Sequence, residues 1–138
     1  MEQQRRTSSG RDLASSHALM IVDALALTAF VLTGAASHHD AGIAVVVARN
    51  LLPLGAAWAL TAAAVGTYRR RSWAALTLTW AVAAPVGILV RSWVVGSPTG
   101  RELVTFLLVG SGFSLLFLGV GRMLLRVASR LRERQMST

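Results

Sequence analysis

Four long apolar segments constrain the fold of this chain more than any other feature of its sequence. They occupy residues 18–36, 51–66, 73–95 and 103–120. A bilayer with a hydrocarbon core about 30 Å thick needs about 20 apolar helical residues to be crossed. Within lipid, only a helix or a closed barrel pairs all of its own backbone polar groups. The sequence therefore predicts an all-α protein, a bundle of four transmembrane helices.

The composition agrees with lipid as the surrounding solvent. Hydrophobic residues make up 54% of the 138 residues and charged residues only 14%, against about 25% charged residues in soluble domains. A single domain is expected at this length. The chain has no cysteine, which excludes disulfides, thiolate metal ligands and a cysteine nucleophile.

The second apolar segment leaves the first residue of its helix open between two alternatives. In the first, Asn50 is the N-cap and Pro53 lies in the first turn, where its missing N–H does no harm. In the second, the helix begins near Gly42, Pro53 kinks it, and the side chain of Arg49 reaches outward. We prefer the first alternative, which gives the span 51–66.

Each end of the first apolar segment has a recognisable sequence pattern. Ser15 or Ser16 is expected to cap the helix, which leaves residues 1–14 as a basic cytoplasmic tail. At the other end, the small residues 34–36 resemble a signal-peptide cleavage site after a basic leader and an apolar core. The carboxylate of Asp23 inside that core argues against a cleaved signal, so we expect a membrane span.

All of the positive charge comes from arginine, and its placement predicts the topology. Eleven of the 14 arginines form three clusters: Arg5, Arg6 and Arg11; Arg69 to Arg71; and Arg122, Arg126, Arg130, Arg132 and Arg134. Because cytoplasmic loops are enriched in Lys and Arg, we expect a multi-pass cell-membrane protein with both termini in the cytoplasm. The clusters flank apolar segments instead of forming one basic face, so nucleic-acid binding is not expected.

The last arginine cluster lies mostly in a C-terminal tail, residues 123–138. An arginine occurs at every fourth position: Arg122, Arg126, Arg130 and Arg134. Leucine and valine lie on the other side of the expected helix. This spacing predicts that the fourth span continues as an amphipathic helix at the inner membrane surface. Anionic headgroups contribute about 1 kcal/mol of binding per nearby arginine, so these headgroups are the expected partner, with a cytosolic protein as the alternative.

Asp23 is the most deeply placed ionisable residue in the four segments. An ionisable group at the bilayer centre costs about 2.5–3.5 kcal/mol on insertion scales, so it needs a partner or water. Asp23 lies about 7 Å from the inner end of its helix, and the fourth segment returns to that side at Arg122. We expect an Asp23–Arg122 ion pair. The functional alternative is a protonatable carboxylate that couples proton binding to transport.

A second polar group is expected at the opposite membrane surface: His38, His39, Asp40, Arg49 and Arg91. We expect these residues to line one outward-facing pocket that binds an anion or relays a proton. The alternative is a polar loop whose arginines reach the headgroups. Adjacent side chains point apart, which disfavours both a metal site and a catalytic triad at this position. We therefore predict no metal, no cofactor and no enzymatic activity.

Several short motifs together resemble a known family. They are Asp23, Gly34 followed by "SHHDAG", "ARNLLP" with Trp58, Trp80 followed by Arg91, and "GR" at the end of the fourth segment. In these motifs the chain resembles, over residues 19–122, the small prokaryotic membrane proteins of the domain of unknown function 3054 family. The resemblance implies four membrane helices and supplies no activity.

Two functions fit the polar residues. One is a small transporter or channel for an ion, a proton or a small anion, with a water-accessible path that touches Asp23 and Arg91. The alternative is a noncatalytic accessory subunit or scaffold of a larger membrane complex, in which the charges are paired and dry. Small residues in the second and fourth segments favour close helix packing, so we expect a homo-oligomer or a membrane-protein partner.

Overall fold

The computed structural model describes residues 2–36 and 42–136, which form helices joined by short turns. The helices are α1 (Glu2–Ala35), α2 (Ile43–Val65), α3 (Thr67–Arg70), α4 (Trp73–Val95) and α5 (Gly100–Met136). No strand occurs among these described residues. All of the helices except α3 are long and apolar enough to cross a membrane, which confirms the predicted all-α fold with four spans.

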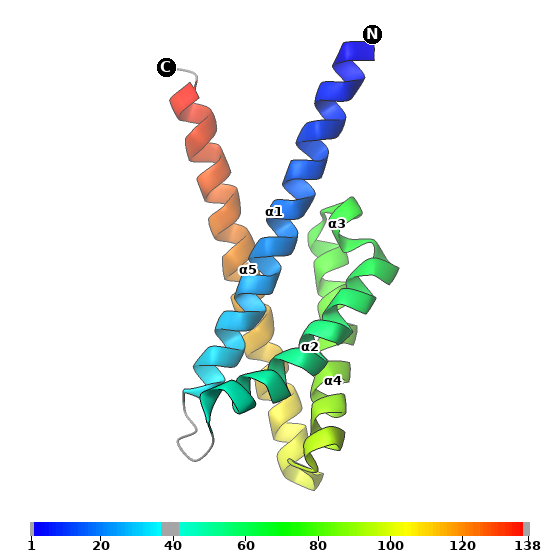
Figure 1. Cartoon of the computed structure of the whole chain (residues 1–138), viewed down its shortest axis with the longest axis vertical. Coiled ribbons are helices and arrows are strands. Elements are labelled where there is room, and N and C mark those ends of the chain that lie inside the picture. Colours follow the sequence, from blue (N-terminus) through cyan, green and yellow to red (C-terminus); the bar gives the residue numbers. More distant parts are fainter. Residues whose placement is uncertain (1, 37–41, 137–138) are drawn as a thin grey trace.

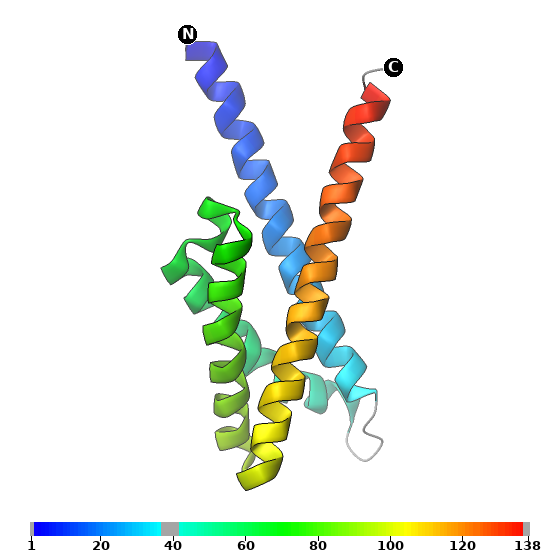
Figure 2. The same ribbon diagram turned by 180° about the vertical axis from the view of Figure 1, so that it is seen from behind.

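The four long helices pack chiefly in two pairs, α1 with α5 and α2 with α4 (Figure 1). Contacts between α1 and α2 and between α4 and α5 join the two pairs. The start of α1, the end of α5 and the short helix α3 all lie toward one end of the molecule, whereas the α4–α5 turn lies at the other (Figure 2). The termini therefore lie at the same end, as four spans require.

Helices α1 and α5 extend beyond the rest of the bundle as two diverging arms (Figure 2). They contain 34 and 37 residues, which is about 51 and 56 Å of helix at 1.5 Å per residue, against a hydrocarbon core of about 30 Å. The predicted helical continuation of the fourth span is therefore present. The prediction that Ser15 or Ser16 caps the first helix is wrong, because α1 begins at Glu2 and the Ser16 hydroxyl is bonded to the α3 region instead.

The preferred start of the second helix at residue 51 is also wrong. Helix α2 begins at Ile43, directly after Gly42, and Pro53 lies inside it. Asn50 does not act as an N-cap because its side-chain amide is already bonded to the preceding turn of α2 and to α4. The helix therefore continues through this position, as in the second of the two alternatives.

Local sequence explains the bounds of α4, which match the predicted span 73–95. The hydroxyl of Ser72 accepts a hydrogen bond of 3.1 Å from the backbone N–H of Ala75, which satisfies one of the free donors at the helix N-terminus. Gly96 ends the helix with a φ of 71°, a left-handed conformation that a residue without a Cβ adopts at little cost.

Two glycines lie at close contacts between the paired helices. A Cβ atom built on Gly87 of α4 would lie 2.8 Å from the Cα atom of Leu54 in α2. A Cβ atom on Gly121 of α5 would lie 3.0 Å from a side-chain carbon of Val22 in α1. Small residues let helix backbones approach closely within a membrane, and each helix pair has such a contact.

Candidate functional site

The ion pair between Asp23 of α1 and Arg122 of α5 is a buried polar contact between two long helices. The Nε atom of Arg122 donates to Oδ1 of Asp23 at 2.9 Å, and its Nη2 atom donates to Oδ2 at 2.6 Å. Asp23 is 0% exposed and Arg122 is 4% exposed. Two parallel charge-assisted hydrogen bonds of this kind are strong and geometrically specific. The pairing expected from the depth of the two residues is therefore present.

The helix faces explain why this pair forms. Asp23 shares the buried face of α1 with Ala26 and Leu27, at the three- and four-residue spacing of one helix side. Gly121 immediately precedes Arg122, and its missing side chain lets α5 approach Val22 of α1. The charged pair thus lies inside the α1–α5 contact.

Tyr68 of α3 lies beside this pair and was not identified from the sequence. The Nε1 atom of Trp58 in α2 donates a hydrogen bond of 2.9 Å to the Tyr68 hydroxyl. Burial raises the pKa of the Tyr68 phenol to about 12; the hydrogen bond from Trp58 opposes this shift, and the neighbouring Asp23 carboxylate reinforces it. The only tyrosine in the chain therefore links α2 and α3 to the buried pair.

The ionisation of Tyr68 provides a direct measurement of this environment. We expect ultraviolet absorbance at 295 nm, recorded during an alkaline titration of the detergent-solubilised protein, to show a midpoint near pH 12 instead of the ordinary 10.0. Because the folded state raises this pKa, the contribution of the protonated Tyr68 phenol to the free energy of unfolding is complete below pH 10. This contribution is lost as pH rises toward 12. A midpoint near 10 while the helical circular-dichroism signal is intact would contradict the buried position of the phenol.

Two further polar contacts hold α3 against the long helices. Thr67 is hydrogen-bonded to Thr79 of α4, and both side chains are fully buried. Thr79 donates its own hydroxyl proton to the carbonyl of Ala75 at 2.8 Å, so Thr67 is the donor in the threonine pair. On the α1 side, Arg71 donates to the Ser16 hydroxyl at 3.0 Å.

Arg91 is used to join helices at the opposite end of the bundle. Its Nε atom donates to Oδ1 of Asn50 at 2.8 Å, and its Nη1 atom donates to the Ser97 carbonyl at 2.8 Å. The guanidinium carbon also lies 5.0 Å from the centre of the Phe106 ring, within the range of a cation–π contact. The same side chain thus contacts α2, the α4–α5 turn and α5.

Of the residues predicted to line an outward-facing pocket, the structure describes Arg49 and Arg91. Arg49 is exposed, and its side chain forms no polar contact with another described side chain. His38, His39 and Asp40 lie outside the described residues, so their place in a pocket stays a prediction. Within the described ranges, no three His, Cys, Asp or Glu side chains gather where one metal ion could bind them.

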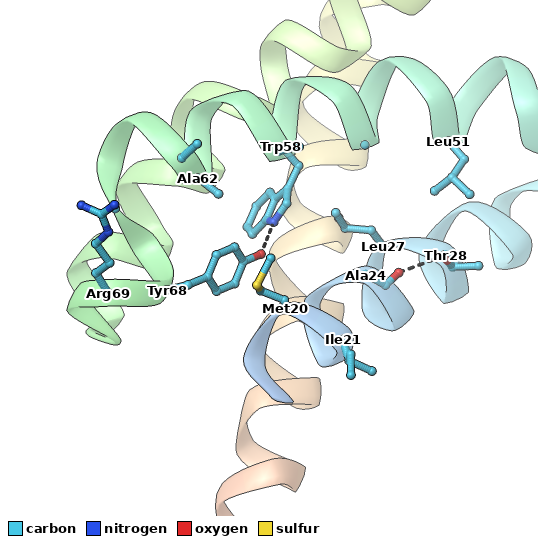
Figure 3. Close-up of a pocket in the computed structure, with 14 residues that line it drawn as sticks. Met20, Ile21, Ala24, Leu27, Thr28, Leu51, Trp58, Ala62, Tyr68 and Arg69 are labelled. Carbon is cyan, nitrogen blue, oxygen red and sulfur yellow. Dashed lines mark hydrogen bonds between the residues drawn. The ribbon is translucent and has the colours of Figure 1, made fainter. Parts of the chain in front are cut away.

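A groove of about 780 Å³ runs between α1 and the α2–α3 corner (Figure 3). Its walls are mostly apolar, and the hydrogen-bonded Trp58 and Tyr68 form part of its lining. Arg69 lies beside Tyr68 at one end of the groove, and Leu51 lies at the other end (Figure 3). Its volume is within the range of about 300–1,000 Å³ that is typical of small-molecule sites.

A known protein family matches most of the chain. The family described as "Protein of unknown function (DUF3054)" matches residues 20–125. The chain belongs to this family. The matched range includes Asp23 and Arg122 and leaves out most of both helical arms, as the resemblance over residues 19–122 implied. No curated protein and no solved structure matches the chain.

Proposed function

We propose that this protein is a noncatalytic scaffold or accessory subunit of a membrane complex. The observation that carries the proposal is the Asp23–Arg122 pair, in which both carboxylate oxygens accept hydrogen bonds and neither side chain is accessible. A carboxylate that carries protons needs contact with water. Asp23 is 0% exposed and is held by two charge-assisted hydrogen bonds, so its geometry favours a role in holding α1 against α5.

The remaining interior polar groups support the same proposal. Trp80 of α4 donates to the Ser111 carbonyl of α5 at 2.9 Å, and Arg91 is bonded to Asn50 and to the α4–α5 turn. These contacts join one helix to another, and the described groove has apolar walls. The transporter or channel alternative receives less support, because a conducting path requires polar groups that face water.

The arm of α5 supplies a surface for a partner. Beyond the buried Arg122 it exposes both arginines and apolar side chains, including Met123, Leu124, Val127 and Leu131. An exposed apolar surface bordered by charge is typical of a contact with another protein or with a membrane surface. The arginine distribution favours a cell-membrane topology in which this arm, the N-terminus and α3 are cytoplasmic.

A flux assay with purified protein in liposomes tests the proposal. We expect proton and chloride fluxes no larger than those of protein-free liposomes, because the buried charges are paired. A flux above that background that is lost in Asp23→Asn, while the variant retains its helical content, would overturn the scaffold proposal and favour transport.

The contact surface can be tested with single cysteines because the chain contains none. We expect Leu131→Cys, in the α5 arm, to form a discrete adduct with a bifunctional thiol–amine crosslinker in native membranes. Trp93→Cys is the matched control, since Trp93 is 85% exposed on α4 near the opposite end. Equal adduct patterns from both positions would contradict a specific contact through the arm.

A further inference from the structure

The groove between α1 and the α2–α3 corner has the form of a lipid site. We propose that it binds one acyl chain of an anionic phospholipid, with the phosphate group held by Arg69. This site is independent of the scaffold proposal, because it depends only on the shape of the groove and on the position of one arginine.

The walls of the groove are suited to a hydrocarbon chain. Buried apolar side chains form its floor, among them Leu27 and Trp58, and exposed ones such as Met20 and Ile21 form its α1 rim. Small residues of α2 complete the lining, beside Leu51 and Trp58 of the same helix: Gly55, Ala59, Ala62 and Ala63. These small side chains leave room beside the larger ones, and the surface of the groove offers little to a polar ligand.

The length of the groove matches one leaflet. Its lining follows α2 from Leu51 to Ala63, which is about 18 Å of helix at 1.5 Å per residue. Half of a hydrocarbon core about 30 Å thick is about 15 Å. Because α2 is inclined to α1, α4 and α5 (Figure 1), a single acyl chain that starts at the headgroup level beside α3 would follow the groove obliquely within this leaflet.

Arg69 gives the groove its charge preference. It lies in α3, between the two membrane spans Ala44–Val65 and Trp73–Val95, and therefore at the level of the headgroups. Its side chain is exposed and forms no ion pair or hydrogen bond with another described residue. A guanidinium group binds phosphate oxygens in a bidentate manner, so a phosphate group complements the end of this groove.

A second copy of the chain is a less suitable occupant. Two parallel copies that pack through this groove would bring their arginine-rich ends together, since Arg69 lies at its mouth and Arg70 follows it in α3. Repulsion between these like charges opposes such a dimer. An anionic phospholipid instead supplies both an apolar chain for the groove and a negative charge for Arg69.

Native mass spectrometry of the full chain, released from detergent and titrated with purified lipids, tests the site. We expect saturable binding of one phosphatidylglycerol and weaker binding of phosphatidylcholine. Arg69→Gln is expected to weaken phosphatidylglycerol binding about fivefold, the effect of losing one arginine–headgroup interaction. Arg70→Gln is the matched control: it removes the same charge from the same helix at a residue that does not line the groove, and we expect a change of less than twofold.

Filling the groove provides a second, independent variant. Ala59→Phe places a ring in the groove and is expected to abolish the saturable binding, whereas Ala56→Phe adds the same ring to an exposed position outside the lining.

Equal affinity for the two lipids, or equal effects of Arg69→Gln and Arg70→Gln, would overturn the proposal. Competition by glycerol phosphate alone would identify a free phosphate ligand instead of a lipid, and dimers that disappear in Ala59→Phe would identify a second copy; each result would also overturn it.

Discussion

Asp23→Ala is expected to lower the free energy of unfolding by about 3–5 kcal/mol, the typical cost of leaving one member of a buried ion pair alone. The substitution removes both acceptors of the Arg122 guanidinium, and Arg122 is 4% exposed. Arg122 would then have to draw in water or leave the α1–α5 contact. Unfolding of the detergent-solubilised protein, followed by circular dichroism during denaturant titration, measures the difference.

Two further variants separate the pair from a general effect of charge. The double variant Asp23→Leu with Arg122→Met is expected to recover most of the lost stability, because it leaves no charge buried. Arg130→Met removes an exposed arginine from the same helix, and we expect it to change stability by less than about 0.5 kcal/mol. A change in stability of less than about 0.5 kcal/mol for Asp23→Ala would show that the ion pair contributes little to the stability of the fold.

The ion pair could be predicted from sequence because helical rise and the order of the spans are enough to bring the two residues together. Asp23 and Arg122 are 99 residues apart, yet Asp23 lies five residues into the predicted span 18–36 and Arg122 lies two residues beyond the predicted span 103–120, at ends that four spans place together. A charge that deep in an apolar segment has few ways to be satisfied. The number of spans was predictable for the same reason, since length and hydropathy determine it.

The start of α2 could not be predicted in this way. Asn50 followed by a nearby proline has the local pattern of a helix N-terminus, and local propensity favours that choice. Its side-chain oxygen instead accepts from Arg91, 41 residues later. Whether Asn50 caps a helix or lies inside one depends on how α2 packs against α4. The sequence of the segment itself does not reveal this packing.

The surroundings of Tyr68 were missed for a related reason. Helix α3 has four residues and lies between two left-handed positions, Gly66 with a φ of 71° and Arg71 with a φ of 50°. These turns direct Tyr68 toward Trp58 and leave Arg69 at the mouth of the groove (Figure 3). The sequence identified this stretch only as an arginine-rich loop, because its geometry depends on backbone turns that composition does not reveal.

The contact between Gly87 and Leu54 predicts the direction in which Gly87→Ala changes the stability of the protein. Replacing glycine by alanine inside a helix normally stabilises it by up to about 1 kcal/mol. Gly87→Ala is expected instead to destabilise the protein by about 1–3 kcal/mol, the usual cost of overpacking. The added Cβ would lie 2.8 Å from the Cα of Leu54 and 3.3 Å from its backbone nitrogen, so α2 and α4 would have to separate.

Gly112→Ala is the matched control, since a Cβ at this helical position of α5 has no neighbour within 4 Å. We expect it to leave stability unchanged or to raise it, and the same denaturant titration compares the two variants. Truncating the neighbour in Leu54→Ala with Gly87→Ala should not restore stability, because the closest atom belongs to the backbone and remains in place. Stabilisation by Gly87→Ala would mean that α2 and α4 are farther apart at this contact, and recovery in the double variant would assign the clash to the leucine side chain.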